Sequence, residues 1–508
     1  MRIARTLGIA GFIFTLVASS LIVPTAAAPA PRTLTMVVGG TTPTLNPHAA
    51  ASTPSVAVFL QIFEGLTRFD DKGKLEPALA ESWRAVDATT WEFKLRRNVR
   101  FHSGHALSAE DVKFSVEQVF RPELRSVQRT RIALVDRVEA VDDQTVRFVT
   151  SKPFPILPAQ LAIIFVASRQ YHAEKGDAYV ADHPVGTGPF RLATWRPGGE
   201  RFEFEAFNEY WGGRPKIDRL IIRQIPEGAT RVSALLAGEA HIANNLPIDL
   251  AERVNQTRGF RIVSGFLGNG LIIGFNIWQK TPLQNAKVRQ ALRFAVDREA
   301  ILRDLLKGQG RILNEQVLTG EAFGYNPDLR PLKYDPARAK ALLAEAGFPS
   351  GFSITLATPQ GRYLMDKEIA TAVAAQLSAV GVQTTVQSMD LGTFARGLIE
   401  GSFAMFLVGW QNSPNFDADT ALQWFQSTSV YRWAGDRVAD RMILDARTTV
   451  DPAKRRALYK RVTEYMHTTQ HPAIFLFQTK LLYGLSAQVD GFVPRPDEYY
   501  NFRTVQVR

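Results

Sequence analysis

The sequence of 508 residues contains no cysteine. This absence excludes disulfide bonds, thiolate metal sites and a cysteine nucleophile. It also excludes the lipid-modified cysteine that anchors many exported bacterial proteins directly after their signal sequence. If the chain is exported, it therefore carries no lipid tether of that kind.

Several catalytic signatures are missing as well. The chain has no Gly-x-Ser-x-Gly elbow, no His-Glu-x-x-His motif and no Walker phosphate loop, and its 8 histidines form no recognisable nucleophile–base pair. These absences argue against an enzyme such as an exported hydrolase. We therefore predict no catalytic residue and no cofactor.

Blocks of like charge are also absent. Lys and Arg together number 60 against 49 Asp and Glu, which gives a formal net charge of +11. Such an excess is compatible with binding to nucleic acid or to a membrane surface. The charges are interspersed, however, as in Asp436-Arg437 and Asp440-Arg441. We therefore expect a solvated basic surface and no nucleic-acid partner.

The long apolar run of the sequence lies at its N-terminus. Arg2 and Arg5 precede an uncharged stretch at 7–23, and small residues follow at 26–28. This order predicts a secretory signal peptide over residues 1–27. An uncleaved membrane anchor is the alternative, because the run is barely too short to span a bilayer. Without a lipid-anchor cysteine, we expect the cleaved protein to be free in the periplasm, with its formal charge lowered from +11 to +9 by the loss of two arginines.

Strand-like and helix-like segments alternate along the rest of the chain. Trp91–Arg96 alternates apolar and polar residues, which predicts a half-buried strand. Phe403–Val408 is continuously apolar, as a strand covered on both faces would be. Three helices are indicated by N-cap residues at Ser108, Asp335 and Asp451, the last two of which precede proline. The pattern predicts an α/β protein with mixed sheets flanked by helices, and the length allows two or three structural units.

A series of short phrases stands in a fixed order along the chain. They are LNPH (45–48), IFEGLTRF (62–69), LEPALAESW (75–83), WEFKLR (91–96), VRFHSG (99–104), GTGPF (186–190), NEYWGG (208–213), VRQAL (288–292) and YDP (334–336). Together they resemble the family 5 extracellular solute-binding proteins, which serve dipeptide, oligopeptide, nickel and glutathione importers. The resemblance covers essentially the whole chain after the signal peptide.

The resemblance implies a two-lobed periplasmic-binding-protein fold of type II, in the large variant whose first lobe carries an extra domain. Carried over to this sequence, the first lobe comprises 28–70, 185–275 and 478–508, the extra domain comprises 71–184, and the second lobe comprises 276–477. The chain then crosses between the lobes by hinge strands. Closure would be a rigid-body bending around the ligand.

The resemblance also implies a function. The protein is expected to be the periplasmic substrate-binding component of an ABC importer, and to act as a monomer that delivers its ligand to a permease in the inner membrane. A di- or oligopeptide leads the candidate ligands. A glutathione-like derivative, an opine, a sugar or a nickel chelate is the alternative, and an exported hydrolase is the rival outside the binding class.

The resemblance assigns the ligand contact chiefly to the residues that follow Phe403–Val408. These residues are Gly409, Trp410, Gln411, Asn412 and Ser413. Trp410 is expected to close one wall of the cleft, with ordinary core packing as the alternative.

Ser413 departs from the pattern of the peptide-binding relatives. Those proteins commonly have an aspartate at this position, which pairs with the ammonium group of the ligand. A hydroxyl supplies no charge to compensate a buried ammonium. Either Asp417 or Asp419 takes over the role, or the ligand has no free ammonium there.

Further contacts are implied at four other residues. Ser52 and Thr53 follow the LNPH phrase, Asn276 stands beside the hinge, and Phe475 lies near the return crossing, where core packing is the alternative. His102 and His105, three residues apart, are a candidate pair of metal ligands. Transition-metal sites need three or four converging ligands, so we predict no metal site there.

Overall fold

The structure is a computed structural model that describes residues 31–508, except 41, 43, 51, 125, 196–199, 412–414 and 430–432 and the side chains of Val127 and Gln411. The predicted signal peptide therefore lies outside the described residues. Within the described residues, every helix is too short or too polar to cross a membrane.

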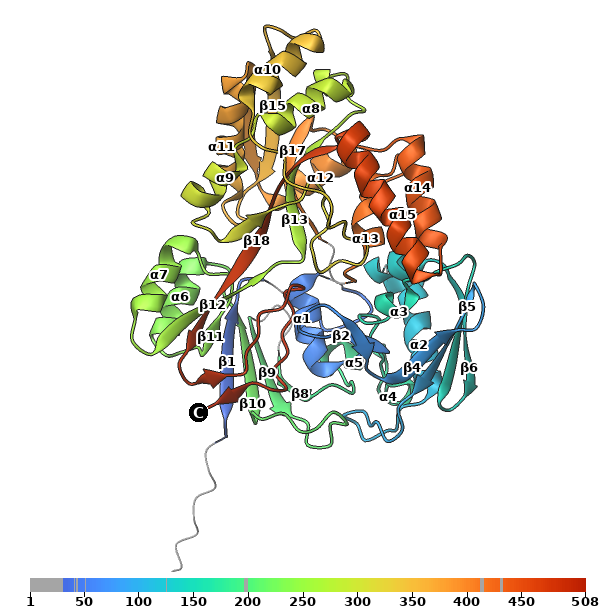
Figure 1. Cartoon of the computed structure of the whole chain (residues 1–508). Helices are drawn as coiled ribbons and strands as arrows, with labels where there is room; N and C mark the ends of the chain where they lie inside the picture. The colour runs from blue at the N-terminus through green and yellow to red at the C-terminus, as the bar shows by residue number, and fades with distance from the viewer. Residues whose placement is uncertain are drawn as a thin grey trace, which may run out of the picture. The chain divides into compact units, whose positions relative to one another are not determined.

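In the described part of the chain, the largest sheet has 12 strands (Figure 1). Its main path runs through β16 (Val382–Met389), β15 (Phe352–Pro359), β17 (Met405–Gln411), β13 (Asn269–Phe275), β18 (Ala473–Ser486), β11 (Ile242–Ala243), β1 (Thr33–Val38), β10 (Arg219–Gln224), β9 (Arg201–Ala206) and β8 (Phe190–Thr194). Two further strands, β12 (Phe260–Phe266) and β14 (Gly310–Ile312), pair with β18. β1 is parallel to β10 and β11, and β15 is parallel to β16 and β17, whereas β13 is antiparallel to β17 and β18. The predicted mixed sheet is confirmed.

β18 connects the two ends of this sheet. Its first residues pair with β13, from Ala473 to Phe477, and its later residues pair with β12, from Lys480 to Ser486. Figure 1 shows the strand running from β13 and β17 toward β11 and β12. All but two of its 14 residues are buried, so the strand has the continuous burial of one covered on both faces.

A separate antiparallel sheet contains β4 (Ala80–Ala85), β5 (Thr90–Leu95), β7 (Thr145–Thr150) and β6 (Val135–Asp142), in that order. Helix α2 (Ala109–Phe120) packs against β6 and β7 and begins after Ser108, as predicted. Phe93, Phe101 and Phe148 are fully buried in the core between them. This part of the chain therefore has a hydrophobic core of its own.

Helices cover both faces of the sheet around β13 and β17. Alternate residues of β13 enter two different cores, with Ile273 in one and Ile272 in the other, because side chains of a strand point to opposite faces. The first core is covered by α8 (Ala286–Phe294), α10 (Pro336–Glu345) and α11 (Asp366–Ala379), and the second by α13 (Ala418–Leu422), α14 (Arg437–Thr448) and α15 (Pro452–Tyr465). α10 and α15 begin at the predicted aspartate caps, and each carboxylate accepts a backbone N–H at 2.8 Å.

The remaining elements are short. They are α1 (Thr53–Ile62), β2 (Thr67–Phe69), β3 (Leu75–Pro77), α3 (Leu157–Gln160), α4 (Arg169–Lys175), α5 (Asp177–Asp182), α6 (Gly228–Leu236), α7 (Ile248–Gln256), α9 (Arg298–Ala300), α12 (Leu391–Glu400), β19 (Val489–Asp490) and β20 (Gln506–Val507). A small apolar cluster joins three segments that lie far apart in the sequence. Phe416, which precedes α13, packs edge-on against Phe69 of β2 at 5.6 Å and contacts Ala162.

Candidate functional site

The end of β17 leaves the hydrophobic core at the predicted ligand-contact residues. The strand is buried through Val408 and becomes half-buried at Gly409 and Trp410. The Tyr363 hydroxyl donates a long hydrogen bond of 3.4 Å to the carbonyl of Gly409. A Cβ atom on Gly409 would lie 2.5 Å from the Tyr363 ring, so only glycine allows this ring to lie against the strand.

Three tryptophans gather at this end of β17. The Trp410 ring meets the Trp424 ring edge-on at 4.5 Å and the Trp433 ring at 6.4 Å. Trp433 is buried, whereas Trp410 keeps part of its surface accessible. Trp410 therefore packs on its neighbours and still offers an aromatic surface, and its contact with ligand stays a prediction.

The two aspartates that follow are both neutralised within the protein. Asp417 accepts two hydrogen bonds from the Arg455 guanidinium, at 2.6 and 2.7 Å. Asp419 accepts one from Arg447 at 2.6 Å. Burial raises the pKa of the Asp417 carboxyl, although Arg455 opposes the shift. Because each carboxylate is paired with an arginine, neither offers a free charge to a ligand.

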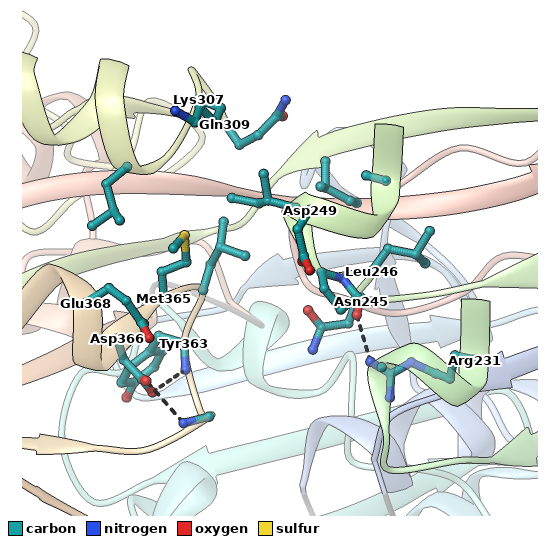
Figure 2. A pocket seen from close by; sticks show the side chains of 18 of the residues that line it. Arg231, Asn245, Leu246, Asp249, Lys307, Gln309, Tyr363, Met365, Asp366 and Glu368 are labelled. Carbon is teal, nitrogen blue, oxygen red and sulfur yellow. Dashed lines mark hydrogen bonds between the residues drawn. The ribbon is translucent and has the colours of Figure 1, made fainter. Parts of the chain in front are cut away.

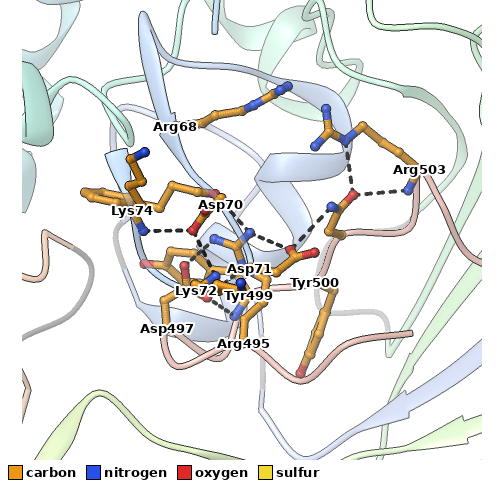
Figure 3. Close-up of polar contacts among 12 residues, drawn as sticks. Arg68, Asp70, Asp71, Lys72, Lys74, Arg495, Asp497, Tyr499, Tyr500 and Arg503 are labelled. Carbon is orange, nitrogen blue, oxygen red and sulfur yellow. Dashed lines mark hydrogen bonds and ion pairs between the residues drawn. The ribbon is translucent and has the colours of Figure 1, made fainter. Parts of the chain in front are cut away.

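The C-terminal segment 495–500 is held in place by ion pairs and hydrogen bonds. Arg495 binds Asp497 at 2.5 and 3.0 Å and Asp71 at 3.2 Å, and it donates to the Phe69 carbonyl at 3.0 Å (Figure 3). The carbonyl of residue 496 accepts the N–H of Gly268, at the start of β13, at 2.7 Å. These bonds hold the segment beside the connection between β12 and β13.

Glu498 lies at the tip of this segment, in the left-handed backbone region with φ of +64°. Its side chain is half-buried, and it makes no hydrogen bond or ion pair with any described residue. Burial raises the pKa of the Glu498 carboxyl, and the Arg362 charge opposes this rise. Arg362 is exposed and likewise lacks an ion-pair partner among the described residues. Two opposite charges thus interact electrostatically without a direct bond.

A cavity of about 1190 Å³ adjoins Arg362 and Tyr363. Figure 2 shows side chains facing it from two sides, namely Tyr363, Met365, Asp366 and Glu368 opposite Arg231, Asn245, Leu246 and Asp249. Ligand pockets commonly occupy about 300–1,000 Å³, so this space accommodates a small ligand together with water.

Two charged residues of the cavity wall fix its loops. Asp366 accepts the N–H groups of Gly361, Arg362 and Tyr363 at 3.1, 2.8 and 3.0 Å. Arg231 donates to the carbonyls of residues 225, 226, 244 and 245 at 2.7–2.9 Å. The exposed lining charges are Glu227, Asp249, Glu252, Lys307, Arg362, Lys367 and Glu368. Both signs of charge are therefore available to a ligand.

The other predicted contact residues have structural partners. Ser52 is the N-cap of α1, where its hydroxyl accepts the Ser55 N–H at 3.4 Å, and Thr53 is the half-buried first residue of that helix. Asn276 is 2% exposed, donates to the Gly401 carbonyl and accepts the N–H of residue 278. Phe475 is fully buried in the core of β18. These positions add no support for ligand contact, which stays a prediction for all four residues.

Part of the predicted contact segment is not described. The backbone of Gln411 pairs with Asn269, but its side chain and residues Asn412 and Ser413 lie outside the described residues.

Sequence reasoning missed Arg362, Tyr363 and Glu498. The first two follow the parallel strand β15, and the loops at the carboxyl ends of parallel strands commonly hold ligands. That signal was present, since the turn Pro359-Gln360-Gly361 directly precedes them. For Glu498 the sequence offered a polar and aromatic run, 494–501, but no indication that its carboxylate would lack a partner.

Metal ligands do not converge in the described part of the chain: no three His, Asp or Glu side chains there are arranged to hold an ion. His102 bonds through Nε2 to the Gly188 carbonyl at 2.9 Å, and burial lowers its pKa to about 4. His105 instead lies 3.6 Å from Glu174. The two imidazoles of the sequence pair therefore have different partners.

Comparison with known proteins gives consistent similarities. The family model described as "Bacterial extracellular solute-binding proteins, family 5 Middle" matches residues 74–432. The chain is 31% identical over 487 residues to the glutathione-binding protein GsiB of Pectobacterium atrosepticum, and the match covers 92% of each chain. It is similar to the structure of HbpA2 from Haemophilus parasuis, with 27% identity, a TM-score of 0.82 and coverage of 94% of this chain and 100% of that one. It is also similar to NikZ of Campylobacter jejuni in complex with Ni(L-His), with 25% identity, a TM-score of 0.80 and coverage of 93% and 99%.

Proposed function

This chain belongs to family 5 of the bacterial extracellular solute-binding proteins, and from that premise we propose that it captures a small ligand in the periplasm and delivers it to an ABC importer permease. The ligand is a di- or oligopeptide or a peptide-like amino-acid derivative such as glutathione. The protein acts as a monomer, without catalysis, after removal of residues 1–27.

One observation carries this proposal. The cavity of about 1190 Å³ is lined on one side by α6, α7 and the loop after β11, and on the other by α11 and the loop before it. These two sides belong to different hydrophobic cores. A cavity between two separately packed bodies, with charges of both signs on its walls, suits a zwitterionic guest enclosed by closure of the bodies.

The hydrophobic cores support a division into lobes close to that expected from the sequence. We propose a first lobe of 28–70, 185–268 and 478–508, an extra domain of 71–184 and a second lobe of 269–477. The first boundary moves from 275 to 268 because Leu271, Ile273 and Phe275 of β13 pack in the second core. The return crossing stays within β18, where Phe477 packs in the second core and Leu481 in the first.

A panel of ligands tests the proposal. The purified mature protein should bind at least one di- or tripeptide, or reduced glutathione, with 1:1 stoichiometry in isothermal titration calorimetry. Ni²⁺ with L-histidine is included in the same panel to test a metal chelate as the alternative ligand. Binding of the chelate alone, or cleavage of the peptides during incubation, would contradict the proposed function.

A further inference from the structure

A zwitterionic guest needs a carboxylate to receive its ammonium group. Of the two aspartates expected to supply it, Asp417 is bonded twice to Arg455 and Asp419 is bonded to Arg447. Both are nearly buried, at 7% and 5% exposure. Arg455 is buried as well, so a ligand that displaced it from Asp417 would leave its charge unpaired, at a cost of about 3–5 kcal/mol. The ammonium acceptor must therefore be another carboxylate.

Glu498 has the properties that the two aspartates lack. Its carboxylate is half-buried and has no hydrogen bond or ion pair with any residue that the structure describes. Its neighbours on the chain are fully engaged, since Asp497 binds Arg495 and accepts the Tyr499 N–H at 3.0 Å, and the Tyr500 hydroxyl accepts from Asn244 at 2.7 Å. Hydrogen bonds thus fix the segment on both sides of Glu498, whereas the Glu498 carboxylate itself has no partner among the described residues.

The backbone conformation also singles out Glu498. Its φ of +64° lies in the region that favours glycine, and a residue with a Cβ pays about 1–3 kcal/mol to remain there. The Glu498 N–H donates to the Arg495 carbonyl at 3.2 Å, which closes a tight turn. The Glu498 carboxylate interacts electrostatically with Arg362, Tyr363 and Asp497.

We infer that Glu498 receives the ammonium group of an amino-acid-derived ligand whose carboxylate pairs with Arg362. The inference rests on the proposed function and specifies the charge pattern of its ligand. Glu498 belongs to the first lobe and Arg362 to the second, so a guest with both charges bridges the two. Each lobe contributes one of these two charges, and the bridged form neutralises both.

Titration of Glu498 gives the pairing a pH dependence. The charged and titratable groups that interact with it are Arg362, Asp497, Tyr363, Tyr483, Tyr499 and Tyr500. Burial raises the pKa of Glu498 in the free protein, and a bound ammonium favours the ionised form. Affinity should therefore fall as the pH decreases through this raised pKa, and binding near it should release protons to the buffer.

The decisive experiment compares Glu498→Gln with the wild type by calorimetry. The probes are reduced glutathione, the tripeptide Ala-Ala-Phe and the N-acetylated form of each. We expect the variant to bind the best free-amine probe at least about tenfold more weakly, as truncation of a close charge pair costs about 2–5 kcal/mol. Proton release should disappear, and the difference between wild type and variant should vanish for the N-acetylated form.

Glu239→Gln is the matched control, because Glu239 is exposed and pairs with Arg223 on the surface. It should bind like the wild type. Equal affinity of Glu498→Gln and wild type for the free amine would overturn the inference while leaving the proposed function intact. An equal loss for free and acetylated probes would also overturn it, since it would indicate a structural role. Failure of the wild type to bind any probe would overturn the proposed function and the inference together.

Discussion

The contact between Gly409 and Tyr363 shows how one missing side chain shapes the site. The ring occupies the space that a Cβ atom at position 409 would need, and its hydroxyl bonds to the same residue's carbonyl. The strand end and the loop before α11 are therefore held together where ligand contact is predicted.

Gly409→Ala should disrupt this contact. A methyl group 2.5 Å from the ring forces Tyr363 aside, which should cost about 1–3 kcal/mol of unfolding free energy and weaken ligand affinity. Urea unfolding and calorimetry measure the two effects. The control is Gly320→Ala, where the nearest atom to the added Cβ is an arginine nitrogen at 3.6 Å. Wild-type behaviour of both variants would contradict the assigned role of Gly409.

The sequence predicted individual residues correctly where the residue type alone determines the local structure, as at helix N-caps. The aspartate caps of α10 and α15 follow from local chemistry, because a short acceptor before proline suits a helix start. The partners of Asp417 and Asp419 were not predictable, since Arg455 and Arg447 lie far along the chain on other helices. The free carboxylate of Glu498 depends in the same way on which partners the fold brings near it.

At the scale of elements, the loop with Arg362 and Tyr363 lies directly before the N-terminus of α11. Asp366 at 3% exposure accepts three consecutive N–H groups of that loop. A carboxylate at this place also interacts favourably with the helix dipole. The orientation of both side chains toward the cavity thus depends on one buried acceptor.

Asp366→Ala should loosen this loop. We expect a loss of about 1–2 kcal/mol of stability, the usual cost of removing a capping acceptor, together with weaker ligand binding. Asp451→Ala removes the corresponding acceptor of α15, which bonds the Lys454 N–H at 2.8 Å. It should lower stability by a similar amount and leave affinity unchanged. Equal affinities of the two variants would count against the loop's role in binding.

Periodicity predicted some of the strands correctly. The apolar run at 403–408 gave the core of β17, whose residues Met405–Val408 are buried. Periodicity did not predict the pairing of β18 with both β13 and β12, because that pairing joins segments about 200 residues apart, as in Leu271 with Phe477. The α/β class was predicted correctly from the alternation of strand-like and helix-like segments, and the family from the order of the phrases.

At the scale of the whole molecule, specific apolar contacts join the proposed lobes. One is the packing of Phe416 against Phe69 and Ala162, and Phe416 adopts φ of +45°, in the region that favours glycine. A strained residue at the meeting of two cores is consistent with an element that changes its environment during closure. The ligand, rather than an extensive shared core, would then decide how closely the lobes approach.

Small-angle X-ray scattering of the mature protein, with and without a saturating ligand found by calorimetry, tests the central claim most directly. Closure of two lobes around the guest predicts a smaller radius of gyration at saturation, and a return to the original value after the ligand is removed by dialysis. A radius of gyration that stays the same at full occupancy would contradict the account.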